Sequence, residues 1–387
     1  MGKNFKGGFI GGFDQLRAPD APTISVTAGS SQVSVAFTNP SDTGGGDITS
    51  YTATAIASGV TTGATSASSP VTITGLSNGT SYSVTGLANN AFGASPYSAA
   101  TSSTVGTKGL IAGGSVGGSR TNAINIVTIE TTGNSTDFGD LTYSASSLGA
   151  VSSSTRAVFG GGKNSAGSEV NTMSYISYVA GSTSTDFGDL TVAREEPAST
   201  SNATRGLFAG GAVSGSQNVI DYITIASAGN ATDFGDLTGT ARRKAGASSS
   251  TRAVFAGGLS SNVIEYVTIG STGNATDFGD LLVTGSLCST GGSSDTRALF
   301  GGINGTDTIE FITIASTGNA TDFGNLTSAR RGANLSNLTK CLFAGGSSSN
   351  VIDQVTIASA GNATDFGDLP GTTDENTACS NAHGGLS

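Results

Sequence analysis

The amino-acid sequence predicts an all-β protein in which a β-sandwich precedes a six-bladed β-propeller. The main observation is a hexapeptide, TDFGDL or one change from it, whose six copies lie 43 to 49 residues apart. The copies begin at Thr136, Thr185, Thr232, Thr276, Thr321 and Thr364. A period of about 40–50 residues built from short strand-like runs is typical of a propeller with one blade per repeat. A single blade cannot bury its own apolar faces, so the six are expected to close into a ring.

Composition supports this fold class and excludes others. The 387 residues include 59 glycines, only 11% are charged, and regular β-branched and aromatic runs favour short strands over disorder. No run of 18 apolar residues occurs, so no membrane span is predicted. The net charge of −10 argues against nucleic-acid binding, and 11 of the 27 acidic residues belong to the hexapeptide copies. Three cysteines without metal-like spacing predict buried free thiols at Cys288, Cys341 and Cys379.

Residues 1–17 are expected to be a separate tail. Four large apolar side chains alternate there with glycines, namely Phe5, Phe9, Ile10 and Phe13. One interpretation is a flexible tail, and the other is a peptide that docks on another subunit, since exposing these side chains is unfavourable. The segment lacks the continuous apolar stretch of a signal peptide, so export by the general secretion route is not expected.

Residues 18–107 are predicted to form the sandwich. Alternating runs occur at 23–27, 32–37, 50–55, 71–74 and 81–87, separated by Pro, Gly, Asn and Asp turns. With Pro22, Phe37 at the usual Trp position, Tyr51, and the pair Leu76 and Tyr82 that matches a tyrosine corner, this segment resembles a fibronectin type III domain. The resemblance implies a spacer, and no RGD tripeptide is present to suggest integrin binding.

Residues 108–387 are predicted to supply six blades of four strands each, A to D. Strand A is a small-residue run such as 149–152, strand B resembles TRAVFAGG, strand C resembles NVIEYVTI, and strand D is the hexapeptide. The double glycine after strand B resembles the kelch repeat, although this chain lacks the tryptophan that kelch blades usually carry. The first strand B, at Lys108, has no strand A before it, so residues 376–382 are expected to pair with it and close the ring.

The recurring charges favour a structural interpretation. The two Asp residues of each hexapeptide are expected to cap turns rather than bind calcium, because no calcium loop motif accompanies them. The basic residue that begins each strand B is predicted to form an ion pair with one of these carboxylates. That set is Lys108, Arg156, Arg205, Arg252, Arg297 and Lys340.

Enzymatic activity is not expected. His383 is the only histidine, which disfavours nucleophilic triads and excludes a copper site with two histidine ligands. Hydrolysis by paired carboxylates remains a minor alternative, with Glu195 and Glu196 as the only adjacent glutamates. No cofactor and no metal are predicted.

The loops indicate where a ligand would bind. The C–D loops are nearly uniform, whereas the B–C and D–A loops, which share the opposite face, vary between blades. Variation between repeats marks a face on which binding can be built, although ordinary solvated loops would vary too. The predicted receptor-binding residues, suited to anionic sugars or phosphate, are Arg194, Arg242, Arg243, Lys244, Arg330 and Arg331. These bases could instead cap strands or pair with Glu195 and Glu196.

The phrases GNATDFGDLTSARRG and STRAVFAGG, together with the sandwich, resemble virion structural proteins of tailed bacteriophages, especially cyanobacterial ones. This resemblance implies a non-enzymatic appendage such as a tail fibre or spike, assembled in the host cytoplasm and located on the virion. Other virion proteins, bound through the tail, and host surface glycans are the expected partners. A homo-oligomer is expected, with no nucleic acid and no membrane insertion. The alternatives are a purely structural neck, baseplate or capsid decoration protein and, third, a glycan-active enzyme.

Overall fold

The computed structural model describes residues 16–29, 32–76, 80–178, 181–286 and 290–386. The chain divides into two compact units, Met1–Gly106 and Thr107–Ser387. The described residues form strands and two short 3-10 turns, η1 (Ile303–Gly305) and η2 (Gly384–Leu386). None of the helical segments in this described part is long and apolar enough to cross a membrane.

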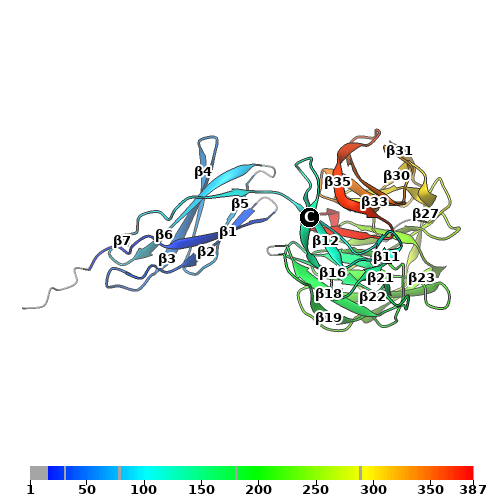
Figure 1. Ribbon diagram of the computed structural model, residues 1–387, viewed down its shortest axis with the longest axis horizontal. Helices are drawn as coiled ribbons and strands as arrows, with labels where there is room; N and C mark the ends of the chain where they lie inside the picture. Colours follow the sequence, from blue (N-terminus) through cyan, green and yellow to red (C-terminus); the bar gives the residue numbers. More distant parts are fainter. Residues whose placement is uncertain (1–15, 30–31, 77–79, 179–180, 287–289, 387) are drawn as a thin grey trace, which may run out of the picture. The chain divides into compact units, whose positions relative to one another are not determined.

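The first unit contains two antiparallel sheets (Figure 1). One has the order β1 (Thr23–Gly29), β2 (Gln32–Thr38) and β5 (Val71–Thr74). The other has the order β4 (Val60–Ser66), β3 (Ser50–Ala57), β6 (Ser81–Asn90) and β7 (Gly93–Ala94), and β8 (Thr101–Thr104) also pairs with β6. Strand β4 was not expected, because its sequence VTTGATS lacks a strong apolar alternation.

The core of this unit follows the two-residue alternation of its strands. Val33 and Val35 from β2 and Ala53 from β3 are fully buried. Leu76 and Tyr82 are also buried, as the tyrosine-corner pattern requires. Phe37 packs on Tyr51 with the ring centroids 4.8 Å apart, so a phenylalanine fills part of the space between the sheets.

The second unit consists of six four-stranded antiparallel sheets, which we number one to six in chain order. Sheet one runs from inner to outer strand as β36 (Thr377–Ser380), β9 (Lys108–Ala112), β12 (Ala123–Thr128) and β13 (Thr136–Asp140). Sheet two contains β15 (Gly149–Ser152), β16 (Arg156–Gly160), β18 (Thr172–Ser177) and β19 (Thr185–Asp189). Sheet three contains β20 (Ala198–Ser201), β21 (Arg205–Ala209), β22 (Gln217–Thr224) and β23 (Thr232–Ala241).

The remaining sheets repeat this order. Sheet four contains β24 (Lys244–Ser248), β25 (Arg252–Gly257), β26 (Val263–Thr268) and β27 (Thr276–Asp280). Sheet five contains β28 (Gly292–Ser293), β29 (Arg297–Gly301), β30 (Thr308–Thr313) and β31 (Thr321–Asn325). Sheet six contains β32 (Ala333–Ser336), β33 (Lys340–Gly346), β34 (Ser349–Thr356) and β35 (Thr364–Thr373). Two short pairs lie in the loops, β10 (Ser115–Val116) with β11 (Ser119–Arg120) and β14 (Ala145–Ser146) with β17 (Lys163–Asn164).

The expected closure between the ends of this unit is present. Strand β36 pairs with β9 in the register Thr377↔Ala112 to Ser380↔Gly109. In Figure 1 the red C-terminal strands accordingly lie beside β12. The inner strands contact one another in sequence, and β36 contacts both β32 and β15, so the six sheets form a closed ring.

A separate apolar core lies between each pair of neighbouring sheets. Two phenylalanines meet at most of these cores, one from the second strand of one sheet and one from the hexapeptide of the preceding sheet. Between sheets two and three these are Phe208 and Phe187, which are 0% and 2% exposed. The residue facing Phe208 is Gly149, where a Cβ atom would lie 2.8 Å from the ring. The small residues of the inner strands therefore make room for these rings.

Each inner strand ends in a serine, and these serines form a belt around the centre of the ring. Ser201 donates its hydroxyl to Ser152 O in the preceding sheet at 2.8 Å, and Ser248 donates to Ser201 O at 2.6 Å. Ser152 donates to Ser380 O at 2.7 Å, which carries the belt across the closure. Ser380 donates to Ser336 O and Ser336 donates to Ser293 O. The hydroxyls of these donor serines are thus satisfied by backbone carbonyls of the preceding sheet.

The repeated hexapeptide fastens each outer strand to the next sheet. The backbone N–H of Asp236 donates to Asn274 Oδ1 at 3.0 Å, and the N–H groups of Gly273 and Ala275 donate to Phe234 O and Asp236 O at 2.8 and 2.7 Å. The same side-chain bond recurs at four further junctions, from Asp189 to Asn230, Asp280 to Asn319, Asn325 to Asn362 and Asp368 to Asn134. The C–D loops have nearly the same sequence because each makes the same hydrogen bonds to the outer strand of the preceding sheet. These bonds also cover the edges of the outer strands.

Candidate functional site

Four consecutive loops that enter the inner strands form what we call the mouth of the ring, made by Ser147, Glu196, Arg243 and Glu375. Their φ angles are 59°, 57°, 58° and 54°, so all four have a left-handed backbone. Their backbones are linked in a row: Ser147 N–H donates to Glu375 O at 2.9 Å, Glu196 N–H to Ser147 O at 2.9 Å, and Arg243 N–H to Glu196 O at 3.3 Å.

This conformation is unfavourable for residues other than glycine, by roughly 1–2 kcal/mol each. Glycine would adopt it freely, yet Glu and Arg occupy three of the four positions. Strained residues with large polar side chains are concentrated at functional sites in proteins. The mouth is therefore a part of the second unit where charged side chains are retained against a backbone cost.

Two charges of the mouth, Glu196 and Arg243, are paired with one another. Arg243 Nε donates to Glu196 Oε1 at 2.6 Å, and Arg242 Nη1 lies 3.7 Å from Glu196 Oε2. Beside them, Lys163 Nζ lies 2.7 Å from Glu195 Oε1. The side chains of Arg242 and Arg243 are 32% and 29% exposed, so both stay accessible at the surface while paired. Glu195 and Glu196 are thus held in ion pairs with bases rather than arranged as two facing carboxylates.

Three of the predicted receptor-binding bases are buried, which corrects that expectation. Arg194 Nη2 lies 3.0 Å from Asp221 Oδ2, with both side chains 0% exposed. Arg330 pairs with Asp353 at 2.7 Å and Lys244 with Glu265 at 2.8 Å, again with almost no exposure. A buried base that already neutralises an acid cannot reach a ligand at the surface.

The acids in these pairs fasten the incoming loop of each sheet. Asp221 also accepts hydrogen bonds from the N–H and the hydroxyl of Thr191, at 3.1 and 2.6 Å, and Asp353 and Glu265 bind Thr327 and Thr238 in the same way. In sheet five Glu310 accepts from the N–H groups of Leu282 and Val283. The sequence held a signal for this role, since an acid recurs after Ile in VIDY, VIEY, TIEF and VIDQ.

Burial shifts the pKa values of these groups. Desolvation lowers the pKa of Arg194, and the charge of Asp221 partly offsets the shift. Desolvation likewise lowers the pKa of Lys244, against the charge of Glu265. The pKa of Glu310 is raised by burial, while the bonds from Leu282 and Val283 lower it. These directions fit an internal structural role.

The ion pairs predicted between the strand-B bases and the hexapeptide carboxylates are wrong. Within the described residues the four arginines, Arg156, Arg205, Arg252 and Arg297, instead lie over an aromatic ring of their own sheet at 4.2 to 4.8 Å. Each guanidinium also donates to a backbone carbonyl of the next sheet, as Arg252 does to Ile314 O at 2.7 Å. The planar guanidinium satisfies ring and carbonyl together, which explains why a base recurs there.

The centre of the ring is narrow and polar. A cavity of about 30 Å³, large enough for about two water molecules, is lined by inner-strand residues including Ser201, Ser336 and Asn334. His383 closes it, with Nε2 3.2 Å from Ser201 Oγ and Nδ1 accepting from Gly385 N–H at 3.1 Å. Burial lowers the pKa of His383 to about 4, so its imidazole is neutral at pH 7. The centre therefore offers no space for an organic ligand.

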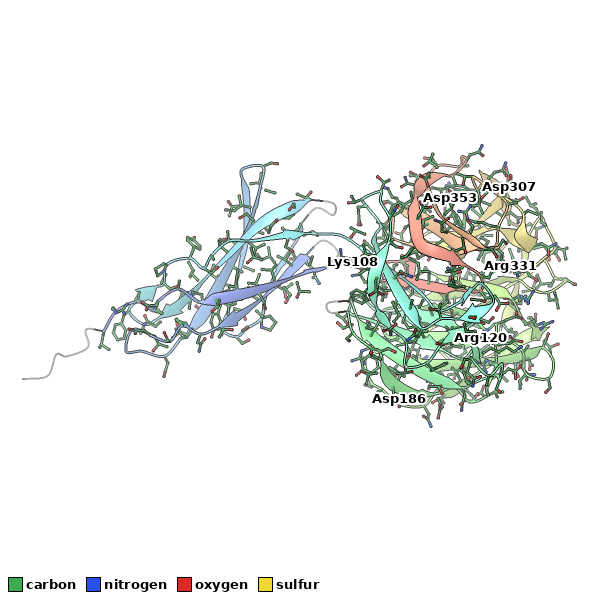
Figure 2. All side chains as sticks on the ribbon, in the orientation of Figure 1. Lys108, Arg120, Asp186, Asp307, Arg331 and Asp353 are labelled. Carbon is green, nitrogen blue, oxygen red and sulfur yellow. The ribbon has the colours of Figure 1, made fainter. Side chains whose placement is uncertain are left out.

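Arg331, the last of the predicted bases, lies where sheets six and one meet. It lines a surface pocket of about 270 Å³ together with Ser115, Ser347, Asp374 and Glu375, which we call the seam pocket. Figure 2 labels Arg331 and Arg120 on one side of this unit and Lys108 on the other. Arg120 Nε donates to Ser146 Oγ, which in turn donates to Glu375 Oε2, so the seam pocket adjoins the mouth.

The other sequence expectations have different outcomes. Cys341 and Cys379 are buried free thiols, and burial raises the pKa of Cys379 to about 12. Cys288 and the docking residues Phe5, Phe9, Ile10 and Phe13 lie outside the described residues. Among the residues that are described, no three His, Cys, Asp or Glu side chains gather in a way that could hold a metal ion.

Comparison with known proteins identifies one domain. The family model for the fibronectin type III domain matches residues 17–104. The strands of the first unit lie within this range, so the N-terminal sandwich is a fibronectin type III domain. No curated protein matches the chain.

Proposed function

We propose that Thr107–Ser387 is a kelch-like six-bladed β-propeller and that the chain is a non-enzymatic appendage of a tailed-bacteriophage virion. In this proposal the propeller is displayed for contact with the host surface or its glycans, and the fibronectin type III domain is a spacer. Residues 1–17 bind other virion proteins. The assembled protein is a homo-oligomer on the particle, without nucleic acid and without membrane insertion.

The observation that carries this proposal is the contrast between the two faces of the ring. On one face the GNAT-type loops form the same hydrogen bonds to the neighbouring sheet at each repeat, as Asn274 does when its Oδ1 accepts from Asp236 N–H. On the other face the loops vary, and Glu196, Arg243 and Glu375 keep large side chains on a left-handed backbone. A rigid ring with one variable face suits a display platform.

The experiment has two arms. Antibodies against the full chain should label intact particles of a phage that encodes it, and the labelled chain should adhere to the cells that this phage infects. Periodate treatment of the cells should abolish adhesion if glycans are the ligand. Failure to label particles contradicts the virion assignment, and failure to adhere contradicts a surface-binding role.

A purely structural decoration is the second candidate. It is favoured by the burial of Arg194, Lys244 and Arg330 in internal ion pairs, which removes half of the predicted binding residues from the surface. Labelling of particles without adhesion to cells would support this candidate. Hydrolysis of host polysaccharide by the full chain would instead support a glycan-active enzyme.

A further inference from the structure

We propose that the seam pocket binds one uncharged sugar ring through its hydroxyl groups. This inference deepens the proposed function and rests on it for its biological meaning, although the pocket can be tested by itself. It replaces the anionic sugar or phosphate that the arginines of the sequence suggested, because the geometry gathers carboxylates and hydroxyls around one of those arginines.

The pocket is built from parts of the chain that meet only when the ring is closed. Ser115 belongs to β10, in the loop between β9 and β12, and Ser347 to the loop between β33 and β34, while Asp374 and Glu375 lead into β36. Ser115 and Asp374 bind each other through both backbone groups, at 2.7 and 2.9 Å. The walls are therefore held by backbone pairing, as a preformed site requires.

Three non-glycine residues around this pocket have a left-handed backbone. They are Ser347, Ser348 and Glu375, with φ angles of 52°, 57° and 54°. The unfavourable conformation holds Asp374 against Ser348, whose N–H and hydroxyl donate to the two carboxylate oxygens at 2.7 and 2.8 Å. Glu375 accepts from Ser146 and Ser147 at Oε2, both at 3.0 Å.

The charge of the pocket disfavours an anion. Two carboxylates and one guanidinium line it, so the net charge of the lining is negative and an anion is repelled by Asp374 and Glu375. A sugar hydroxyl both donates and accepts, so it can donate to a carboxylate and accept from a serine or from the guanidinium. Charge-assisted hydrogen bonds of this kind are the stronger ones in proteins.

The volume fits one ring rather than a long chain. Pockets for small molecules usually measure roughly 300–1,000 Å³, and the seam pocket, at about 270 Å³, lies just below that range. Hydrogen bonds from one such ring give an affinity in about the millimolar range. Several copies of the chain in one particle would then raise the effective affinity through multivalency.

The test uses the full chain and two sugars that differ only at C6, where glucose has a hydroxymethyl group and glucuronate a carboxylate. Saturation-transfer NMR with titration should show glucose binding about tenfold more tightly than glucuronate, as one lost charge-assisted bond predicts. The nearly isosteric variants Asp374→Asn and Glu375→Gln should each weaken glucose binding about tenfold and narrow the preference against glucuronate. Galactose, mannose and N-acetylglucosamine extend the neutral set.

The matched control is Glu169→Gln, since Glu169 lies 3.6 Å from Lys163 in a loop of the same face but not in the seam pocket. It should leave binding unchanged, and thermal unfolding should show that all variants remain folded. Absence of binding by every neutral sugar at 100 mM (about a hundredfold above a millimolar Kd), equal binding of glucuronate, or unchanged binding in both pocket variants would each overturn the proposal.

The cell assay separates this inference from the proposed function. If the wild-type chain and both pocket variants adhere to cells equally, the seam pocket is not the contact site and the display function stands. If glucose binds the pocket but the chain adheres to no host cell, the pocket stands and the display function fails.

Discussion

Arg194 and Asp221 form an ion pair at 3.0 Å in which neither side chain is exposed to solvent. Arg194 lies in the loop that leads from sheet two to sheet three, and Asp221 lies in the third strand of sheet three. The pair therefore fixes the path of the loop at the point where it enters the ring. Similar pairs at Arg330 and Lys244 show that the variable face is built on a repeated buried foundation.

Removing one partner of this pair should be strongly destabilising. Asp221→Asn leaves a buried, uncompensated guanidinium, and we expect a loss of about 3–5 kcal/mol in the free energy of unfolding. The double variant Arg194→Met with Asp221→Leu should recover much of that loss, because no buried charge remains. Urea unfolding measures both, with Arg242→Ala as the surface control at about 0–1 kcal/mol. Equal costs for the single and double variants would contradict this account.

The strand-B arginines should matter more than the hexapeptide carboxylates. Arg252→Ala removes a charged donor to Ile314 O and a cation–π contact with Tyr266, so we expect a cost of about 2–3 kcal/mol. Asp277→Asn in the exposed first Asp of the same sheet's hexapeptide should cost about 0–0.5 kcal/mol. Denaturant unfolding compares the two variants. A large effect at Asp277 would restore the original ion-pair interpretation.

The pH dependence of stability should contain a contribution from His383. Its pKa is about 4 in the folded protein, below the value of about 6.5 expected for the unfolded chain. The unfolded state thus binds the proton first, and the contribution is complete above pH 6.5 and is lost as the pH falls towards 4. The loss amounts to at most about 3 kcal/mol.

Unfolding curves of the wild type and of His383→Gln between pH 7.5 and 4 give this contribution by subtraction. The variant should show a flatter dependence in that window. Carboxylates such as Glu310 titrate in both proteins, so they cancel in the difference. Parallel curves would mean that His383 is not desolvated in solution.

The pairing of β36 with β9 should be essential for the second unit. Deletion of residues 377–387 removes the inner strand of sheet one, and with it Ala378 from the core that sheets one and six share. We expect loss of cooperative unfolding and a larger hydrodynamic radius by size-exclusion chromatography. Deletion of 384–387 alone, which removes η2 but keeps β36, should leave a folded ring of reduced stability. A cooperative transition in the longer deletion would contradict the closure.

The repeat made the arrangement of strands predictable, because the hexapeptide period sets the number of sheets and the missing strand before Lys108 places β36. Burial of the bases was not predictable from composition, because Arg and Lys are usually exposed. Arg194 is buried only because Asp221, 27 residues later in a different strand, is placed against it. The seam pocket was also not predictable from the sequence, because Ser115 and Asp374 become neighbours only after the ring has closed.

The closure has a consequence for biosynthesis. Lys108 and Asn381, which are hydrogen-bonded across the closure, are 273 positions apart in the chain. At typical translation rates the ribosome needs roughly 15 to 55 s to synthesise these residues, and β9 has no β36 to pair with during this time. Nascent chains thus expose an open sheet edge for longer than most domains take to fold. A prematurely terminated product lacks β36, so this edge of β9 stays unpaired and is open to pairing with another chain.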